Sequence, residues 1–289
     1  MTILALALVV GSAVLHATWN LLAKRGAGGV GFVWLFSVVT LCLYVPIAIA
    51  WMAHFRPAFT STHLAFALGS GVLHVGYFVF LQRGYRVGDL SLVYPLARGS
   101  GPALATALAI VLLGERPAPQ ALLGTLLVVV GVFVLSGGRR APDRTRRTAI
   151  GYGLLTGAFI ASYTVWDGYA VAHLGASPLL FLVAAEASRV VLLTPLALRR
   201  RAEIRATWSA YRLEVIGVAV LSPLAYVLVL SAMQHAPISL VAPTRELSIL
   251  FATLIGSRFL AEGEGARRGA AAVAMVVGVA LLALSRGST

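Results

Sequence analysis

Residues Ser91 to Leu135 read SLVYPLARGSGPALATALAIVLLGERPAPQALLGTLLVVVGVFVL and set the architecture of the chain. The segment holds two apolar runs of helical length, joined by a short charged turn at Gly114–Pro117. The same phrase returns from Ser239 to Leu284 as SLVAPTRELSILFATLIGSRFLAEGEGARRGAAAVAMVVGVALLAL. The Ser-Leu-Val-x-Pro motif recurs at an offset of 148 residues, and the turn glutamates, Glu115 and Glu262, recur at 147. A helix pair repeated one half-chain apart indicates an internal duplication.

The composition indicates an integral membrane protein. Hydrophobic residues make up 59% of the chain, charged residues 11%, and the mean hydropathy is +0.90, whereas soluble domains carry about a quarter charged residues. The net charge of +13 does not indicate nucleic acid, because the arginines lie between apolar runs, where the positive-inside rule explains them. The single Cys42 and the scattered histidines predict no disulfide, metal site or cofactor.

The apolar segments predict an all-α membrane protein. A spanning helix needs roughly 20 mainly apolar residues. Clusters of charge, Gly and Pro separate ten such segments, at 3–23, 31–53, 64–84, 90–113, 120–136, 149–171, 178–198, 213–233, 238–260 and 267–285. The first lacks a basic leader and is too long for a signal peptide, so we expect a span there. A helical bundle follows because irregular backbone facing lipid would leave its polar groups without partners.

The duplication extends through the whole chain. Trp19-Asn20 in the first predicted helix matches Trp166-Asp167 in the sixth at an offset of 147. We therefore expect a first five-helix repeat over 1–138, a second over 149–286, and a basic connecting loop at 139–148. Because five is odd, the second repeat enters the membrane from the opposite side. Inverted repeats of this kind are typical of alternating-access transporters.

The charge distribution predicts the orientation of a multi-pass protein in the cell (inner or plasma) membrane. The loops after the odd-numbered helices, with the helix ends that adjoin them, carry 17 Lys/Arg, whereas the termini and the remaining loops carry 3. Basic loops stay in the cytoplasm, so both termini are expected outside.

The chain resembles the EamA-type drug/metabolite transporter superfamily. The resemblance rests on the two five-helix repeats, a Pro early in the fourth helix, a glutamate ending it, and His16-Ala-Thr-Trp19-Asn20-Leu-Leu-Ala-Lys24. It implies a basket in which helices 1, 3, 4, 6, 8 and 9 line a central cavity for a small-molecule substrate. Relatives carry amino acids, sugars, nucleotide sugars, drugs and other metabolites. They often have cytoplasmic termini, from which this sequence departs.

Charges inside a bilayer are costly and usually face a cavity or each other. Arg98 in the fourth helix and Glu246 in the ninth lie at similar depths, counted from opposite faces. Two interpretations stand evenly: Arg98 holds an anionic group while Glu246 takes an amine or a proton, or the two form a structural salt bridge. Arg245, beside Glu246, is expected to point to another helix or to headgroups. Glu186 and Arg189 are expected to form a structural pair within the seventh helix.

Aromatic side chains with a few polar groups are expected to line the substrate site, as suits an amphiphilic or cationic ligand. The predicted substrate-binding residues are His16, Trp19, Asn20, His74, Tyr77, Tyr94, Arg98, Tyr163, Trp166, Asp167, Tyr226 and Glu246. Trp19 and Trp166 lie near helix ends, so interfacial positions compete with the preferred cavity-lining role. Pro95 and Pro102 interrupt the fourth helix, with a kink favoured over full unwinding.

These patterns predict a secondary transporter that exports a small amphiphilic metabolite, such as an amino acid or derivative, by alternating access. The alternative is a multidrug or cationic-compound exporter, import stays open, and an intramembrane lipid-modifying enzyme is a remote rival. No P-loop is present, so ATP is not the direct energy source. Glu246 and Asp167 are the predicted proton carriers, with Glu246 favoured because water is expected to reach Asp167 near its helix end. The sequence is also compatible with a homodimer.

Overall fold

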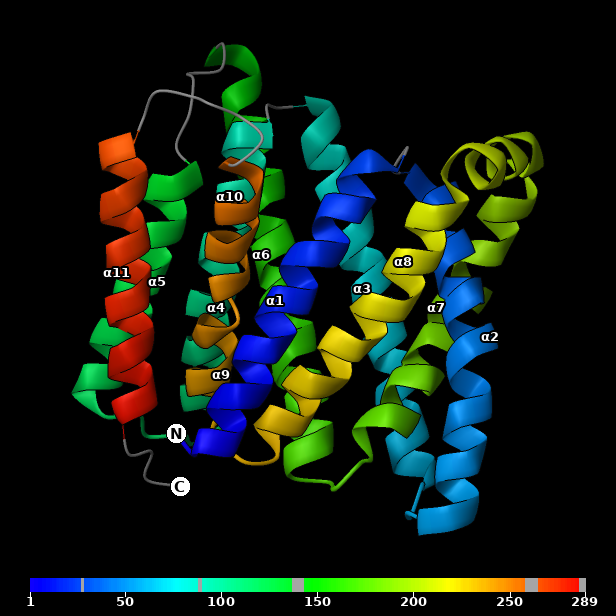
Figure 1. Ribbon diagram of the computed structural model, residues 1–289, viewed down its shortest axis with the longest axis horizontal. Coiled ribbons are helices and arrows are strands. Elements are labelled where there is room, and N and C mark those ends of the chain that lie inside the picture. Colours follow the sequence, from blue (N-terminus) through cyan, green and yellow to red (C-terminus); the bar gives the residue numbers. More distant parts are fainter. Residues whose placement is uncertain (27–28, 88–89, 137–142, 258–264, 286–289) are drawn as a thin grey trace.

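A computed structural model describes residues 1–26, 29–87, 90–136, 143–257 and 265–285 (Figure 1). Almost all of the described chain is helical, and it contains no β-strand. Turn residue Glu262, residues 258–260 of the ninth predicted span and residues 139–142 of the basic loop lie outside these ranges. The helices are α1 (Ile3–Arg25), α2 (Gly29–Phe55), α3 (Ser61–Val87), α4 (Leu90–Leu113), α5 (Pro119–Ser136), α6 (Asp143–Ala172), α7 (Pro178–Leu198), α8 (Arg201–Met233), α9 (Ile238–Thr244), α10 (Leu247–Ser257) and α11 (Gly265–Leu284).

The helices have the length and surface of membrane spans. Within the described chain, α1, α2, α3, α4, α6, α7 and α8 are long and apolar enough to cross a bilayer, and Pro119–Leu135 and Gly269–Leu284 are shorter apolar helices. Large apolar side chains cover the outside, among them Val111 at 77% and Ile47 at 52% exposure. Such a surface is stable when hydrocarbon surrounds it. The chain is a multi-pass membrane protein.

The start of α1 and the end of α11 lie at one end of the bundle (Figure 1). The amino group of Met1 donates to the carbonyl of Ser285 at 2.7 Å, which ties the start of α1 to the end of α11. The basic ends of α1 and α3, the basic start of α6 and the arginines around the α7–α8 junction lie at the opposite end (Figure 1). The basic helix ends on which the predicted orientation rests therefore gather at one end of the bundle, opposite the start of α1.

The two halves of the chain pack into each other. α1 packs along α8, and α6, its counterpart in the second half, packs along α3. Likewise α4 packs on α6 while α10 packs on α1, and α5 packs along α11. Gly124 and Gly278 mark the closest crossing, because a Cβ on either would lie 2.6–2.7 Å from the other's carbonyl oxygen. Small residues permit this close helix packing in membranes. Each half therefore buries its helices largely against the other half.

The ninth predicted helix is wrong as a continuous span, because it breaks at Arg245 and Glu246 into α9 and α10. Pro243 lacks the N–H that would bond the carbonyl of Ser239, and the hydroxyl of Thr106 lies 3.5 Å from that carbonyl. The next turn tightens, since Glu246 N bonds Pro243 O and Ile249 N bonds Glu246 O, a three-residue spacing. The break places two buried charged side chains at a tight three-residue turn between α9 and α10.

The fourth predicted helix keeps its bounds, whereas the eighth differs from its prediction. α4 runs without interruption from Leu90 to Leu113, so the prolines do not unwind it. α8 begins twelve residues before its predicted start at 213 and changes direction at Tyr211, where φ is −132° and ψ is 28°.

Candidate functional site

An ion pair joins α4 to the break between α9 and α10. The guanidinium of Arg98 lies 2.9 Å from a carboxylate oxygen of Glu246 and donates to the hydroxyl of Ser248 at 3.3 Å. Arg98 is 7% exposed and Glu246 is 1% exposed. Removing two charged side chains from water costs free energy that their mutual attraction has to offset. A buried pair of this kind either links the helices structurally or forms a site where a charged ligand takes the place of one partner.

The paired residues occupy equivalent positions in the duplicated sequence. Pro95 aligns with Pro243 at an offset of 148, and the same offset carries Arg98 onto Glu246. α4 packs against α9, its counterpart. The ion pair therefore lies where the two halves of the molecule meet, with a cation contributed by one half and an anion by the other.

Arg245 is a second buried cation beside this pair. It is 4% exposed, and its charge acts on His16, Asp167 and Glu246. Of the two contacts expected for Arg245, its burial fits a contact to another helix and does not fit headgroups. Among the described residues, the Nε atoms of Arg98 and Arg245 have no hydrogen-bond partner. In the part of the chain that the structure describes, Glu246 pairs with Arg98 and no ion pair involves Arg245. Two buried guanidinium groups beside one carboxylate leave positive charge and donor capacity for an anion.

A second carboxylate, Asp167 of α6, lies in a neutral setting. It accepts hydrogen bonds from the hydroxyl of Ser70 on α3, at 2.9 Å, and from the phenol of Tyr226 on α8. It is 0% exposed and forms no ion pair within the described chain. The prediction that water reaches Asp167 is wrong because α3 and α8 both pack against α6 and close over it. Its second oxygen, Oδ1, has no partner among the described residues.

Aromatic rings connect the two carboxylates. His74 of α3 stacks on Tyr163 at a centroid distance of 4.2 Å and meets Tyr226 edge-on at 5.6 Å. Tyr77 contacts Tyr163 edge-on at 5.9 Å. The charge of Arg98 acts on the phenols of Tyr77, Tyr94 and Tyr163. Six predicted site residues from α3, α4, α6 and α8 therefore form one continuous cluster with Arg98 and Glu246; these are His74, Tyr77, Tyr94, Tyr163, Asp167 and Tyr226.

α1 contributes His16 to the same region. The charges of Arg98 and Arg245 act on His16, whose ring lies 4.7 Å from that of Trp19. Trp19 is partly buried and packs against the cluster that includes Phe32 and Val215. The amide of Asn20 donates to the carbonyl of His16 at 2.7 Å, within its own helix.

Trp166 lies outside this cluster, contrary to its predicted cavity-lining role. It is 38% exposed, stacks on Phe66 at 4.3 Å and donates its Nε1–H to the carbonyl of Phe66 at 2.8 Å. Adjacent residues on a helix point about 100° apart, so Trp166 and Asp167 cannot face the same interior. Sequence recurrence marked the pair but did not show which member faces inward.

Glu115 recurs in the sequence repeat as a turn glutamate, and the structure shows its contacts. Its two carboxylate oxygens accept from the backbone N–H groups of Ile238 and Ser239, at 2.8 and 2.9 Å. These are the first residues of α9, whose N–H groups have no partner within the helix. Glu115 thus fixes the start of the short helix that ends at Arg245 and Glu246.

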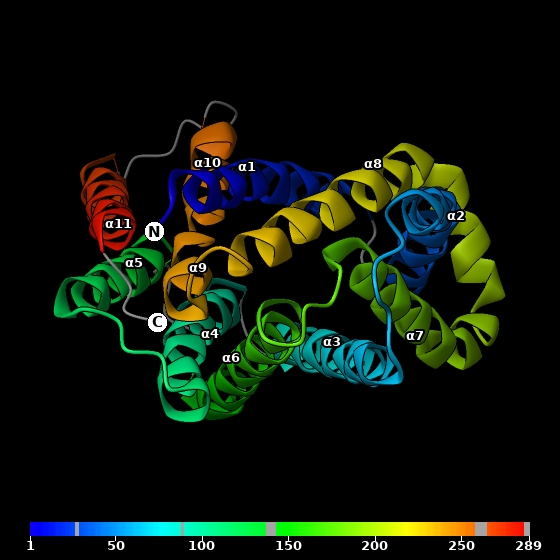
Figure 2. The same ribbon diagram turned by 90° about the horizontal axis from the view of Figure 1, so that it is seen from below.

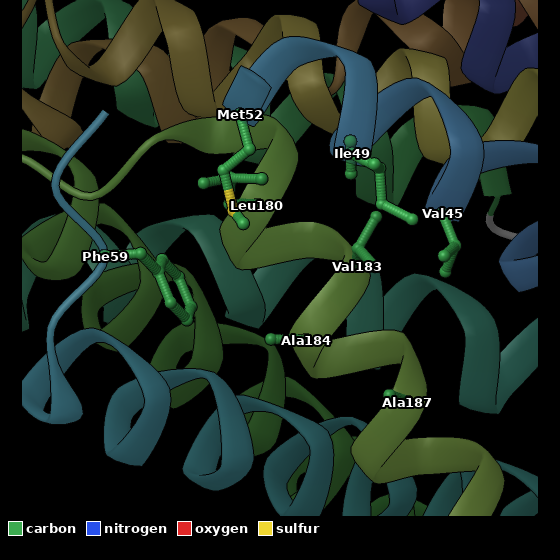
Figure 3. Close-up of a pocket in the computed structure, with 9 residues that line it drawn as sticks. Val45, Ile49, Met52, Phe59, Leu180, Val183, Ala184 and Ala187 are labelled. Atoms are coloured by element: carbon green, nitrogen blue, oxygen red, sulfur yellow. The ribbon is translucent and has the colours of Figure 1, made fainter. Parts of the chain in front are cut away.

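Two further features are separate from the charged region. Glu186 and Arg189 pair within α7, and Arg189 also donates to Ser37 of α2 at 3.1 Å, which confirms the structural pair. An apolar pocket of about 230 Å³ lies between α2 and α7 (Figure 3). It is lined by Val45, Ala48, Ile49, Met52, Phe59, Leu180, Val183, Ala184 and Ala187. With only apolar lining, it does not suit a polar substrate.

Comparison with known proteins identifies the family. The sequence model of the EamA-like transporter family matches residues 3–137 and again residues 147–284. The chain belongs to the EamA-like transporter family. Nothing among the curated proteins matches it. A solved crystal structure, described only as that of a protein, matches with a TM-score of 0.77 and 16% identity, covering 97% of this chain and 98% of that one. At this identity the likeness shows the fold alone.

Family membership makes this protein a membrane transporter and not an enzyme. The two matched segments are the two sequence repeats. A transporter implies a small-molecule substrate and embedding in a bilayer.

Proposed function

We propose that this EamA-family protein is a secondary transporter that exports a small amphiphilic metabolite bearing an anionic group, such as an amino acid or derivative. The observation that carries the proposal is the buried Arg98–Glu246 pair at 2.9 Å, with Arg245 beside it. A carboxylate on the substrate would displace Glu246 from Arg98 and use the donors that now lack partners. The aromatic cluster would hold the apolar part of the substrate, and Asp167 its amine.

Alternating access is supported by the way the halves are built. We infer that α5, the combined α9–α10 and α11 complete ten spans, in two inverted five-helix repeats around the site. α1 starts at the end where α11 finishes, and α6 starts at the opposite end (Figure 1). The pairing of α1 with α8 has its exchanged counterpart in α6 with α3, and that of α3 with α7 in α8 with α2. Rocking of one set of helices against the other would open the site to one membrane face at a time. We place the termini outside the cell (inner or plasma) membrane, following the charge bias.

Proton coupling is better supported at Asp167 than at Glu246. Glu246 lies next to two guanidinium groups, which stabilise its charge. The near neighbours of Asp167 are neutral: Ser70 and His74 from α3, Tyr163 from α6 and Tyr226 from α8. No ion pair joins Asp167 to an arginine in the described part of the chain. A buried carboxylate without a close counter-charge is costly, and binding a proton or a substrate amine removes that cost.

The test is efflux and uptake in proteoliposomes, with a panel of zwitterionic, anionic and cationic amphiphilic compounds, with and without a pH gradient. Transport of a compound with a carboxylate, lost in Arg98→Gln, is the expected result. Transport restricted to cations without an acidic group would overturn the substrate class and favour the multidrug alternative, which the Asp167 and aromatic cluster would serve.

A further inference from the structure

The first third of α8 is a surface helix and not part of a span. Residues 201–211 connect the end of α7 to the kink at Tyr211. This yellow-green segment runs across the end of the bundle, around the outside of α2, before α8 turns inward (Figure 2). It lies at the end opposite the start of α1, where the basic segments gather (Figure 1).

One face of this segment is fixed to the protein. Ile204 packs against the cluster of Phe32 and Leu35 from α2, and Thr207 is 5% exposed. Glu203 extends toward Gly31 at the start of α2 and pairs with Arg200 at 3.4 Å. The segment is thus held rigidly along its inner side.

A neighbouring face carries an exposed row of three arginines and one tryptophan. Arg201, Arg205 and Trp208 follow one another at spacings of four and three residues, which places them along one stripe of the helix, and Arg212 follows directly after the kink at Tyr211. The three arginines are exposed, and Trp208 is 41% exposed. Within the described part of the chain, no ion pair or hydrogen bond engages these arginine side chains. We call these four residues the arginine–tryptophan stripe.

The surface below the stripe faces lipid. After the kink, Leu213 is 75% exposed, Ile216 40% and Val220 39%, so the exposed apolar surface of the α8 span begins where the stripe ends. The stripe therefore lies at the level where hydrocarbon meets headgroups. Tryptophan prefers this level, and arginine extends its guanidinium from there to phosphates.

We propose that the arginine–tryptophan stripe binds the phosphate headgroup of an anionic phospholipid at the basic end of the transporter. Three guanidinium groups without protein partners complement a negatively charged headgroup, and Trp208 rests on its glycerol region. The packing of Ile204 and Thr207 on the inner side holds Arg201, Arg205 and Trp208 on one outer face, which distinguishes a lipid site from a diffuse positive surface. This site is independent of the central one and of the transported substrate.

The test titrates purified full-length protein in neutral detergent with phosphatidylglycerol and with phosphatidylcholine, and counts bound lipids by native mass spectrometry. The triple variant Arg201→Gln, Arg205→Gln, Arg212→Gln removes the proposed site. The matched control Lys24→Gln, Arg25→Gln, Arg86→Gln removes as many charges from the same end of the bundle, at α1 and α3. A single Arg205→Gln variant serves if the triple variant does not fold.

We expect at least roughly tenfold weaker phosphatidylglycerol binding in the triple variant and about fivefold in Arg205→Gln, from the usual worth of a basic side chain near an anionic surface. The control stays within about twofold of the wild type, and phosphatidylcholine binds weakly throughout. Brominated phosphatidylglycerol should quench wild-type fluorescence more than that of Trp208→Phe. Equal loss in stripe and control variants, or equal binding of both lipids, would overturn the proposal. Competition by inorganic phosphate alone at millimolar concentration would identify a free-anion site instead.

Discussion

The arrangement of charges at the helix break predicts that replacing Glu246 and replacing Arg98 lower the stability of the protein by different amounts. In Glu246→Gln, the guanidinium groups of Arg98 and Arg245 remain buried together without a close carboxylate. In Arg98→Gln, Glu246 keeps Arg245 as a counter-charge. The first change should therefore destabilise the protein more than the second, although both delete the same 2.9 Å contact.

The expected sizes follow from burial. Removing one partner of a buried pair costs about 3–5 kcal/mol, because it leaves an uncompensated charge. Glu246 is 1% exposed, so Glu246→Gln should reach that range. Arg98→Gln loses charged contacts to Glu246 and Ser248 but leaves one charge of each sign, for which about 1.5–3 kcal/mol is typical. For a protein of this size, 1 kcal/mol shifts the midpoint of thermal unfolding by roughly 2–4 °C.

The assay is thermal unfolding of both variants and the wild type in one detergent, followed by fluorescence and by loss of monodisperse protein. Glu246→Gln should unfold on the order of 10 °C below the wild type, with Arg98→Gln between them. The charge swap Arg98→Glu with Glu246→Arg exchanges the residues between equivalent positions and should recover part of the loss. If Arg98→Gln is the less stable single variant, the assignment of Arg245 as a shared cation is refuted.

Four further predictions address coupling, capping, packing and orientation. Asp167→Asn should abolish accumulation driven by a pH gradient while substrate counterflow survives, and gradient-driven transport by this variant would exclude Asp167 as the proton site. Glu115→Gln keeps only one acceptor for the two N–H groups of α9 and should lower stability by about 1 kcal/mol; an unchanged melting midpoint would contradict the cap. Gly278→Leu places side-chain atoms where a Cβ already meets the Gly124 carbonyl at 2.7 Å, so the protein should lose monodispersity, whereas Gly151→Leu, at an open position, should not. A reporter fused to the C-terminus should lie outside the cell, and a cytoplasmic signal would invert the predicted orientation.

Much of the fold follows from local sequence. Runs of apolar residues of spanning length require helices in hydrocarbon, whatever their neighbours are. The recurrence of the Ser-Leu-Val-x-Pro phrase and of Gly-containing steps is sufficient by itself to indicate the duplication. From their matching depths, an ion pair between Arg98 and Glu246 was one of two equally weighted interpretations, because charges in a bilayer rarely stay unpaired.

The features of the site that the sequence did not contain are contacts between distant elements. Asp167 is screened from water by α3 and α8, and its partners Ser70 and Tyr226 are 97 and 59 residues away in the chain. Trp166, its neighbour, faces outward although the same recurrence marked both. Which side of a helix meets the interior depends on the neighbouring helices, and no period in a uniformly apolar segment encodes it.

The helix break between α9 and α10 separates what the sequence determines from what the tertiary structure determines. The sequence by itself determined that both Pro95 and Pro243 interrupt backbone bonding, since proline has no N–H. Only the tertiary structure decided that α4 stays continuous while α9 ends, with Thr106 beside the freed Ser239 carbonyl and Glu115 holding the N-terminus of α9. Local chemistry fixes which hydrogen bond is lost, and packing fixes which partner replaces it and therefore where the charges of Arg245 and Glu246 point.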